Sequence, residues 1–168
     1  AIYPTGDFMN KQDIYNLLKE KGIRHQIFEH EAVYTIEGML ALGLPDAHRG
    51  AKNLFLRDDK KHFYLLVAKE DRKINMKELQ AKLGTRRLSF ASETQLMDIM
   101  GLISGAVCPF GVLNDSRKQV TVFFDDYFSD GIIGVHPLDN TASVFLNVSD
   151  IVEIIKPYCL DFQYVCLE

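Results

Sequence analysis

Two short segments near the middle of the chain carry residue types that suit the stabilisation of a negatively charged oxygen. In the first, Lys52 begins an apolar run that continues to Leu56, and a strand there would hold the ammonium group rigidly. In the second, Gly105 and Pro109 bracket three residues, where glycine lets the backbone lie close to a ligand and proline fixes the bend. A fixed cation beside exposed backbone N–H groups is typical of oxyanion-stabilising sites. The alternatives are a solvent-facing lysine and a plain turn.

His136 is the histidine best suited to chemistry, since an imidazole titrates near neutrality and can serve as acid, base or hydrogen-bond donor. A structural histidine at the end of a strand is the alternative. The other histidines show no metal-ligand spacing, and the chain has no HExxH, GxSxG, Walker or dinucleotide-binding glycine motif. We therefore expect no metal, no cofactor and no nucleophilic serine.

The three cysteines, Cys108, Cys159 and Cys166, have no CxxC spacing. An odd number without that spacing argues against a disulfide framework and against a zinc site, and it fits a reducing cytoplasm. Cys108 lies between Gly105 and Pro109, so a nucleophilic role has to be weighed. A small buried hydrophobic residue is the favoured interpretation, because cysteine is commonly buried for packing alone.

The order of these segments resembles the YbaK/ProX family of freestanding prolyl-tRNA editing proteins. The motifs that carry the resemblance are KNLFL from Lys52, Gly105 to Pro109 with Gly111, Asn114-Asp115, and HPLDNTA from His136. Each is weak alone, but their order and spacing together are specific, and the resemblance covers about residues 13–155.

The resemblance implies roles for the matching residues. Lys52 would hold the terminal adenosine or phosphate end of a tRNA and help orient the ester, and it need not be the base in proton transfer. The backbone from Gly105 to Pro109 would grip the aminoacyl carbonyl, and His136 would wall the pocket or orient the substrate. We therefore expect Lys52, Gly105 and His136 to be the catalytic residues. The expected substrate-binding residues are Asn53, Ala106, Val107, Cys108, Pro109, Phe110, Asn114 and Asn140.

The implied activity is hydrolysis of a mischarged aminoacyl-tRNA, with tRNA(Pro) as carrier and alanine as the wrong amino acid. A proline pocket cannot strongly reject a smaller amino acid by packing, so a second site that admits small side chains is needed. An aminoacyl ester is already activated, and the neighbouring ribose hydroxyl can assist an attacking water. The protein would then mainly position groups and stabilise the oxyanion.

Alanine, rather than cysteine, follows from a finer resemblance. The KNLFL, PFGVLND and HPLDNTA motifs are closer to the ProX/PrdX branch, which clears alanine, whereas the cysteine-clearing YbaK branch tends to follow its lysine with threonine. Val107-Cys108 replaces the polar residues often found before this proline, which leaves cysteine, serine or another small residue open. A non-catalytic module that senses aminoacyl-tRNA or an amino acid is an alternative, as is a hydrolase of another small ester.

The charge distribution suits a limited contact with tRNA. The net charge is −4, yet residues 49–87 carry 12 Lys and Arg against 5 Asp and Glu, and the remainder carries 7 against 18. A one-sided basic region fits a salt-sensitive contact with a few phosphates. Solvated surface lysines and arginines are the alternative. We expect no DNA and no membrane partner, and association with prolyl-tRNA synthetase is left open.

The 168 residues, 47% of them hydrophobic, suffice for one domain. Met9 opens a helical pattern, so residues 1–8 are expected to be a cloning remnant, leaving 9–168 as a single aminoacyl-tRNA editing domain. The predicted fold is α+β, a mixed sheet of six or seven strands flanked by helices, as in YbaK-like proteins. Helices are predicted at 10–21, 36–42, 76–83, 92–100 and 149–155, an extended or looped segment at 107–113, and strands at 23–29, 51–57, 62–68, 87–91, 120–125, 132–136 and 142–146.

Overall fold

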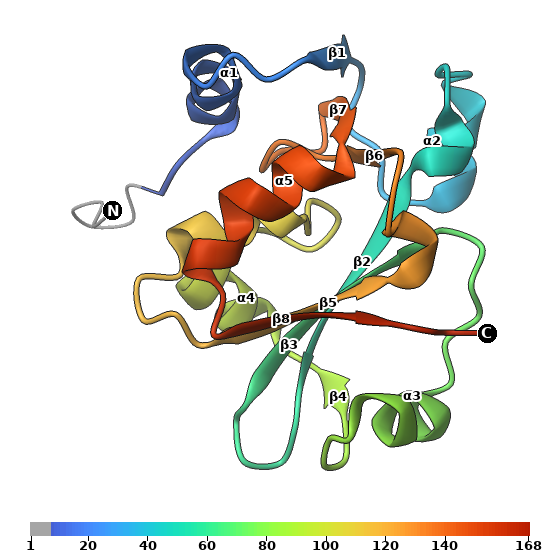
Figure 1. Cartoon of the computed structure of the whole chain (residues 1–168), viewed down its shortest axis with the longest axis vertical. Helices are drawn as coiled ribbons and strands as arrows, with labels where there is room; N and C mark the ends of the chain where they lie inside the picture. The colour runs from blue at the N-terminus through green and yellow to red at the C-terminus, as the bar shows by residue number, and fades with distance from the viewer. Residues whose placement is uncertain (1–7) are drawn as a thin grey trace.

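Two β-sheets organise the computed structural model, which describes residues 8–168 (Figure 1). One sheet is antiparallel with the order β1-β7-β6, and the other has the order β4-β2-β3-β5-β8, in which β3, β5 and β8 run parallel. A bridge between Gly50, the residue before β2, and Gly134 in β6 links the two sheets. The strands are β1 (His25–Glu29), β2 (Ala51–Arg57), β3 (Phe63–Lys69), β4 (Ser89–Phe90), β5 (Val120–Asp125), β6 (Ile132–Val135), β7 (Ala142–Asn147) and β8 (Asp161–Val165).

Side-chain caps define where four of the five α-helices in residues 8–168 begin. The side chains of Asn10, Thr35, Asn75 and Ser92 each accept a hydrogen bond from the backbone N–H three residues on, which satisfies a donor that the helix leaves free. The α-helices are α1 (Lys11–Glu20), α2 (Ile36–Ala41), α3 (Met76–Leu83), α4 (Glu93–Met100) and α5 (Val148–Ile155), and the 3-10 helices are η1 (Ala47–Arg49), η2 (Pro109–Asn114), η3 (Asp126–Phe128) and η4 (Lys156–Tyr158).

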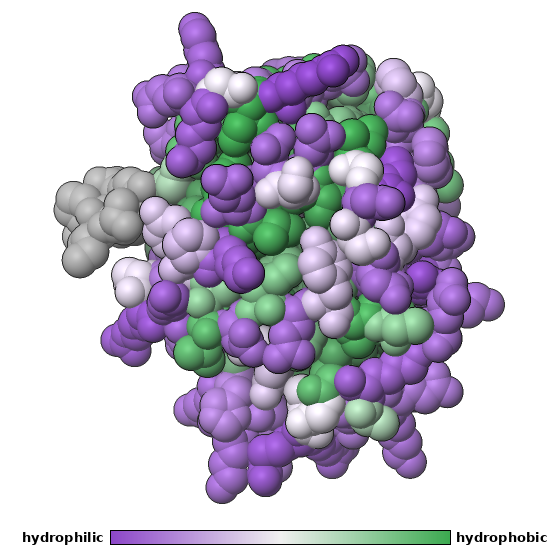
Figure 2. Space-filling view, in the orientation of Figure 1, coloured by the Kyte–Doolittle hydropathy of each residue, from purple (hydrophilic) through white to green (hydrophobic). Residues whose placement is uncertain are grey.

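Strand β2 separates two hydrophobic clusters. Because side chains alternate between the faces of a strand, Phe55 enters the main core with Phe110 and Phe124, whereas Leu56 enters a smaller cluster beneath α3 with Leu79. The end of the molecule that carries α3 and the β2–β3 hairpin is covered mostly by hydrophilic side chains (Figure 2). In the part of the chain that the structure describes, no helix has the length and apolar character to cross a membrane.

The α+β class is confirmed, as are the β2–β3 hairpin, the helices and the caps of the first four α-helices. The cap predicted at Ser149 is wrong, because α5 begins at Val148 and Asn147 precedes it without a side-chain cap bond. The strands, however, form two sheets rather than one, and they number eight within residues 8–168. The sequence reading missed β8, an edge strand whose residues are mostly exposed and whose pairing partner β5 lies about 40 residues earlier. The segment expected to be extended or looped at 107–113 instead contains η2, which Pro109 opens.

The predicted remnant at residues 1–8 lies outside the described residues, except for Phe8. The ring of Phe8 lies against Gly101, at the end of α4. The backbone N–H of Met9 donates to Asn114 Oδ1 at 2.9 Å, so the chain is attached to the domain from this point on.

Candidate functional site

A cavity of about 330 Å³ lies where the two sheets meet. Its walls come from segment 33–36 and α2 on one side, from β2 on another, and from the 104–107 turn and the β6 and β7 strands opposite. Of the residues predicted from the sequence, the structure brings five to this wall, although the motifs that contain them are up to 84 positions apart. These are Lys52, Asn53, Gly105, Val107 and His136.

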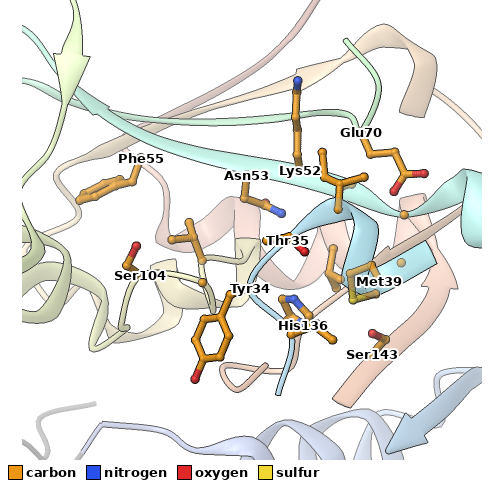
Figure 3. Close-up of a pocket in the computed structure, with 18 of the residues that line it drawn as sticks. Tyr34, Thr35, Met39, Lys52, Asn53, Phe55, Glu70, Ser104, His136 and Ser143 are labelled. Carbon is orange, nitrogen blue, oxygen red and sulfur yellow. The ribbon is translucent and has the colours of Figure 1, made fainter. Parts of the chain in front are cut away.

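Lys52 borders the cavity but its ammonium points away from it. Figure 3 shows the side chain leaving β2 on the face opposite to Asn53, and Nζ donates to the backbone carbonyl of Arg72. Burial lowers the pKa of Lys52, and the nearby charge of Asp71 acts in the opposite direction. In this arrangement the ammonium lies on the outer face of β2, which suits a contact with a phosphate better than proton transfer inside the cavity.

Asn53 extends from β2 toward Thr35 and His136 (Figure 3). Its Oδ1 is buried and has no hydrogen-bond partner among residues 8–168. A buried polar atom left unpaired costs about 1–3 kcal/mol, so such atoms are commonly paired when a ligand is bound. The amide of Asn53 is therefore available to hydrogen-bond a molecule in the cavity.

His136 presents one ring nitrogen as an acceptor. Its Nδ1 lies 2.8 Å from the carbonyl oxygen of Ala142, so Nδ1 carries the proton and donates, and Nε2 of the neutral ring is left as an acceptor. Burial lowers the pKa of His136, the bond to Ala142 partly opposes this, and His30 lowers it further. The ring is therefore neutral near pH 7, as hydrogen-bond acceptance or general-base catalysis requires.

Gly105 adopts a left-handed backbone conformation, with φ of +95°, against the ring of Tyr34. A Cβ at this position would lie 2.8 Å from Tyr34 Cδ1. Asn140 holds the segment that carries the tyrosine, because its Nδ2 donates to the carbonyl of Val33 at 3.0 Å and its carbonyl accepts from the N–H of Val33 at 3.4 Å. The close approach that glycine permits is thus made by Tyr34, and Asn140 positions Tyr34 rather than lining the cavity.

The remaining predicted residues lie behind the cavity wall. Cys108 and Phe110 are fully buried in the main core, and burial raises the pKa of the Cys108 thiol to about 12, which makes this cysteine unsuited to act as a nucleophile. Asn114 is buried as well, and its Nδ2 donates to the carbonyl of Met100 at 3.0 Å. Ala106 and Pro109 are also buried, so these side chains support the turn from below rather than bordering the cavity.

Glu70 and Tyr34 are among the cavity residues that the sequence did not predict. Glu70 follows β3, and burial raises the pKa of its carboxyl group, with a further increase from Asp71. Tyr34 precedes the helix cap Thr35, and the pattern around it signalled only the start of a helix. Neither residue belongs to a motif, and an aromatic residue or a glutamate at a loop is too common to mark a site without the fold.

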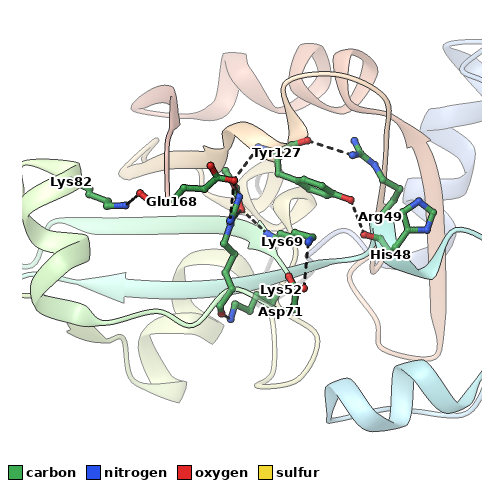
Figure 4. Close-up of polar contacts among 10 residues, drawn as sticks. His48, Arg49, Lys52, Lys69, Asp71, Lys82, Tyr127 and Glu168 are labelled. Atoms are coloured by element: carbon green, nitrogen blue, oxygen red, sulfur yellow. Dashed lines mark hydrogen bonds and ion pairs between the residues drawn. The ribbon is translucent and has the colours of Figure 1, made fainter.

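A network of ion pairs fixes the loop behind Lys52 (Figure 4). Arg72 donates to the fully buried carboxylate of Asp125 at 2.9 and 3.2 Å, so the carbonyl that accepts from Lys52 is held in place. Much of the basic region is paired internally, which leaves fewer cations for an external phosphate. Further ion pairs join Arg86 to Asp59, Lys69 to Asp71 and Arg72 to Glu168. Hydrogen bonds to backbone carbonyls hold Lys82 at Glu168, Arg57 at Asp58, and Arg49 at Tyr127, Asp130 and Ile132.

Comparison with known proteins agrees with this geometry. A model of the aminoacyl-tRNA editing domain matches residues 30–154. The chain is 44% identical over 152 residues to the prolyl-tRNA editing protein ProX of Acetoanaerobium sticklandii, covering 89% of this chain and 93% of that protein. It is 23% identical over 155 residues to the multifunctional Ser/Thr-tRNA deacylase ProXp-y of Escherichia coli, covering 90% and 92%.

The fold is also similar to that of a solved structure described as a candidate trans-editing enzyme for prolyl-tRNA synthetase. The TM-score is 0.68 at 14% identity, over 99% of both chains, so this likeness concerns the fold alone. The family model covers most of the chain, and ProX is similar over nearly its whole length. The protein therefore belongs to the family of aminoacyl-tRNA editing domains, as its motifs indicated.

Proposed function

We propose that this protein is a freestanding hydrolase that removes alanine from mischarged Ala-tRNA(Pro), releasing alanine and free tRNA. The similarity to ProX and the family membership support an editing deacylase. The observation that carries the proposal is the cavity itself, in which a neutral His136 and the unpaired amide oxygen of Asn53 come together beside the Gly105 turn. We propose that residues 9–168 form the single aminoacyl-tRNA editing domain.

The size of the cavity fits the end of the substrate. A volume of about 330 Å³ is at the lower end for small-molecule sites and can receive an aminoacyl group with part of its ribose. It excludes a base-paired stem. Val107 and Met39 border it with apolar surface, which favours a methyl side chain over a hydroxyl group.

The reaction needs no protein nucleophile. A water oxygen attacks the ester carbonyl, the bond between that carbon and the ribose oxygen breaks, and the ribose oxygen takes a proton. His136 Nε2 would accept a hydrogen bond from the water or from the neighbouring ribose hydroxyl, and Asn53 would orient the aminoacyl group. Lys52, on the outer face of β2, would hold the terminal phosphate.

Serine and cysteine are the second candidates as the amino acid removed. The Escherichia coli relative is named a Ser/Thr-tRNA deacylase, which supports keeping serine in the comparison. Of the two unusual residues before Pro109, Val107 borders the cavity whereas Cys108 is in the core, so specificity depends on Val107. We also propose that the protein acts in the cytoplasm, where tRNA is charged, and that it associates with prolyl-tRNA synthetase.

The test is deacylation of Ala-, Cys-, Ser- and Pro-tRNA(Pro) by the wild type and by Asn53→Ala. We expect rapid loss of alanine, no loss of proline and a strong reduction in the variant. Preferential loss of cysteine or serine would correct the amino acid and keep the reaction. If no ester is hydrolysed, the protein is a non-catalytic sensor of aminoacyl-tRNA or of an amino acid. If a free alanine ester is hydrolysed as fast as Ala-tRNA(Pro), the protein is a general esterase.

A further inference from the structure

Tyr34 is an unusually exposed residue for a cavity wall. It borders the cavity, yet 67% of its surface is exposed to solvent. Figure 3 shows the hydroxyl group directed away from Asn53, so the flat ring rather than the hydroxyl is what Tyr34 presents near the cavity. An aromatic ring of this size left in solvent at a cavity edge is a surface on which a ligand can stack.

The ring is also held in place. Its Cδ1 and Cε1 edge lies against Gly105, at 2.8 and 3.3 Å from the position of a Cβ there. The preceding Val33 makes two hydrogen bonds with Asn140, and the following Thr35 caps α2 by accepting from the N–H of Gly38 at 3.0 Å. Fixing a ring before the ligand arrives reduces the entropy that binding costs.

We propose that Tyr34 is the stacking platform for the unpaired 3′-terminal base of the tRNA, which positions the ester over the cavity. This inference rests on the proposed function, since it takes the aminoacyl end as the ligand. Unpaired bases commonly stack on exposed aromatic side chains, and the terminal base is joined to the ribose that carries the ester. The neighbouring Ile36 and Leu40, 41% and 53% exposed, extend the apolar rim beside the ring.

The experiment measures binding and not turnover. The probe is a fluorescent acceptor-stem RNA whose terminal ribose carries alanine through an amide that cannot be hydrolysed, beside the same RNA with an abasic terminal nucleotide. Dissociation constants are measured by fluorescence anisotropy for the wild type and for Tyr34→Leu and Tyr34→Phe. Tyr158→Leu is the matched control, because Tyr158 is 44% exposed and does not border the cavity.

Removal of the terminal base should weaken binding by the wild type about 10-fold, as for loss of one stacked base. Tyr34→Leu should weaken binding of the intact RNA by a similar factor and should show no further loss with the abasic RNA. Tyr34→Phe and Tyr158→Leu should bind both RNAs as the wild type does.

Equal affinity of the wild type for the two RNAs, or no binding of either, would overturn the proposed role of Tyr34. This comparison uses the wild type alone, so it does not depend on whether a variant folds. The platform would also be overturned if removal of the terminal base weakened binding by Tyr34→Leu as much as it weakens binding by the wild type. That result would indicate that the ring contacts something else, such as a protein partner. The proposed function fails separately: if Ala-tRNA(Pro) is not hydrolysed while the analogue binds with base dependence, the deacylase is wrong and the platform holds.

Discussion

Lys52 and Asn53 are adjacent in the chain but leave β2 on opposite faces. Asn53 enters the cavity with an unpaired oxygen, while the ammonium of Lys52 donates to the carbonyl of Arg72 outside it. In the proposed reaction the two residues of one motif would therefore act on different parts of the ligand. The amide of Asn53 would contact the aminoacyl group, and the ammonium of Lys52 would contact the phosphate on the face of β2 turned away from the cavity.

Substitution of these two residues should separate their roles. Asn53→Ala should lower kcat for Ala-tRNA(Pro) by about 10- to 100-fold. It should change the free energy of unfolding by less than about 1 kcal/mol, because the Asn53 oxygen has no partner to lose among the described residues. Lys52→Ala should abolish detectable deacylation at substrate concentrations that saturate the wild type, mainly by raising KM, without unfolding the protein. Steady-state kinetics and denaturant titration check both.

Lys52→Arg is the matched control, since it keeps the charge and should recover part of the affinity. An unfolded Lys52→Ala protein, or one with full activity, would contradict a role for Lys52 in binding. If Lys52 served only to hold the Arg72 carbonyl, Lys52→Ala and Lys52→Arg would lose equal amounts of unfolding free energy.

A side chain at position 105 should displace Tyr34. In Gly105→Ala the methyl group would meet the ring at 2.8 Å, and a φ of +95° is unfavourable for any residue except glycine. We expect a loss of about 1–3 kcal/mol in unfolding free energy and at least 10-fold lower deacylation. Gly105→Leu should block the cavity completely. Gly84→Ala is the control, since Gly84 has a similar positive φ but open space around it.

Comparable activity losses in Gly105→Ala and Gly84→Ala would show that backbone strain alone, and not the ring, is responsible. Unchanged alanine hydrolysis by Gly105→Leu would remove the 104–107 turn from the site.

The activity should fall at acid pH because of His136. Burial lowers the pKa of this ring below its ordinary value of 6.5, and only the neutral ring can accept a hydrogen bond at Nε2. The acid limb of the kcat/KM profile should therefore have its midpoint below 6.5 and disappear in His136→Gln. An unchanged limb in that variant would assign the titration to another group, with Glu70 the next to test.

The same shift affects stability. The unfolded chain binds the proton at higher pH than the folded one, so the contribution of His136 is fully present above pH 6.5 and is lost as the pH falls toward the lower, folded-state pKa. Unfolding free energy measured across this range should decline less in His136→Gln than in the wild type.

Asp125 should be critical for stability. It is fully buried and accepts hydrogen bonds from Arg72 and from the backbone N–H groups of Lys69 and Tyr127. These bonds hold the pKa of the Asp125 carboxyl below its usual value, although burial acts in the opposite direction. Asp125→Asn should cost about 3–5 kcal/mol of unfolding free energy, because it removes the buried counter-charge of Arg72 and leaves only the exposed carboxylate of Glu168, 3.8 Å away.

The neighbouring Asp126→Asn is the control, since Asp126 is exposed and should change stability by less than about 0.5 kcal/mol. Thermal and denaturant unfolding of the two variants gives the comparison. Equal stabilities would mean that the buried pair contributes little and that the Arg72 loop is held by other contacts.

The sequence alone determined the local structure and the family. Helix caps such as Asn75 and Ser92 act within four residues, and the β2–β3 hairpin is formed by two adjacent runs, so both could be predicted from short patterns. The order of the Lys52, Gly105 and His136 motifs sufficed for the family, because that order is a property of the chain.

Only the tertiary structure decided which of these residues share a cavity. The alternation of a strand shows that Lys52 and Asn53 diverge, but which face meets the cavity depends on where β6 and β7 pack. The contact between Tyr34 and Gly105 joins positions 71 residues apart, and neither has a local signal for the other. The edge strand β8 likewise exists because β5 offers it hydrogen bonds, not because its own sequence is strongly strand-forming.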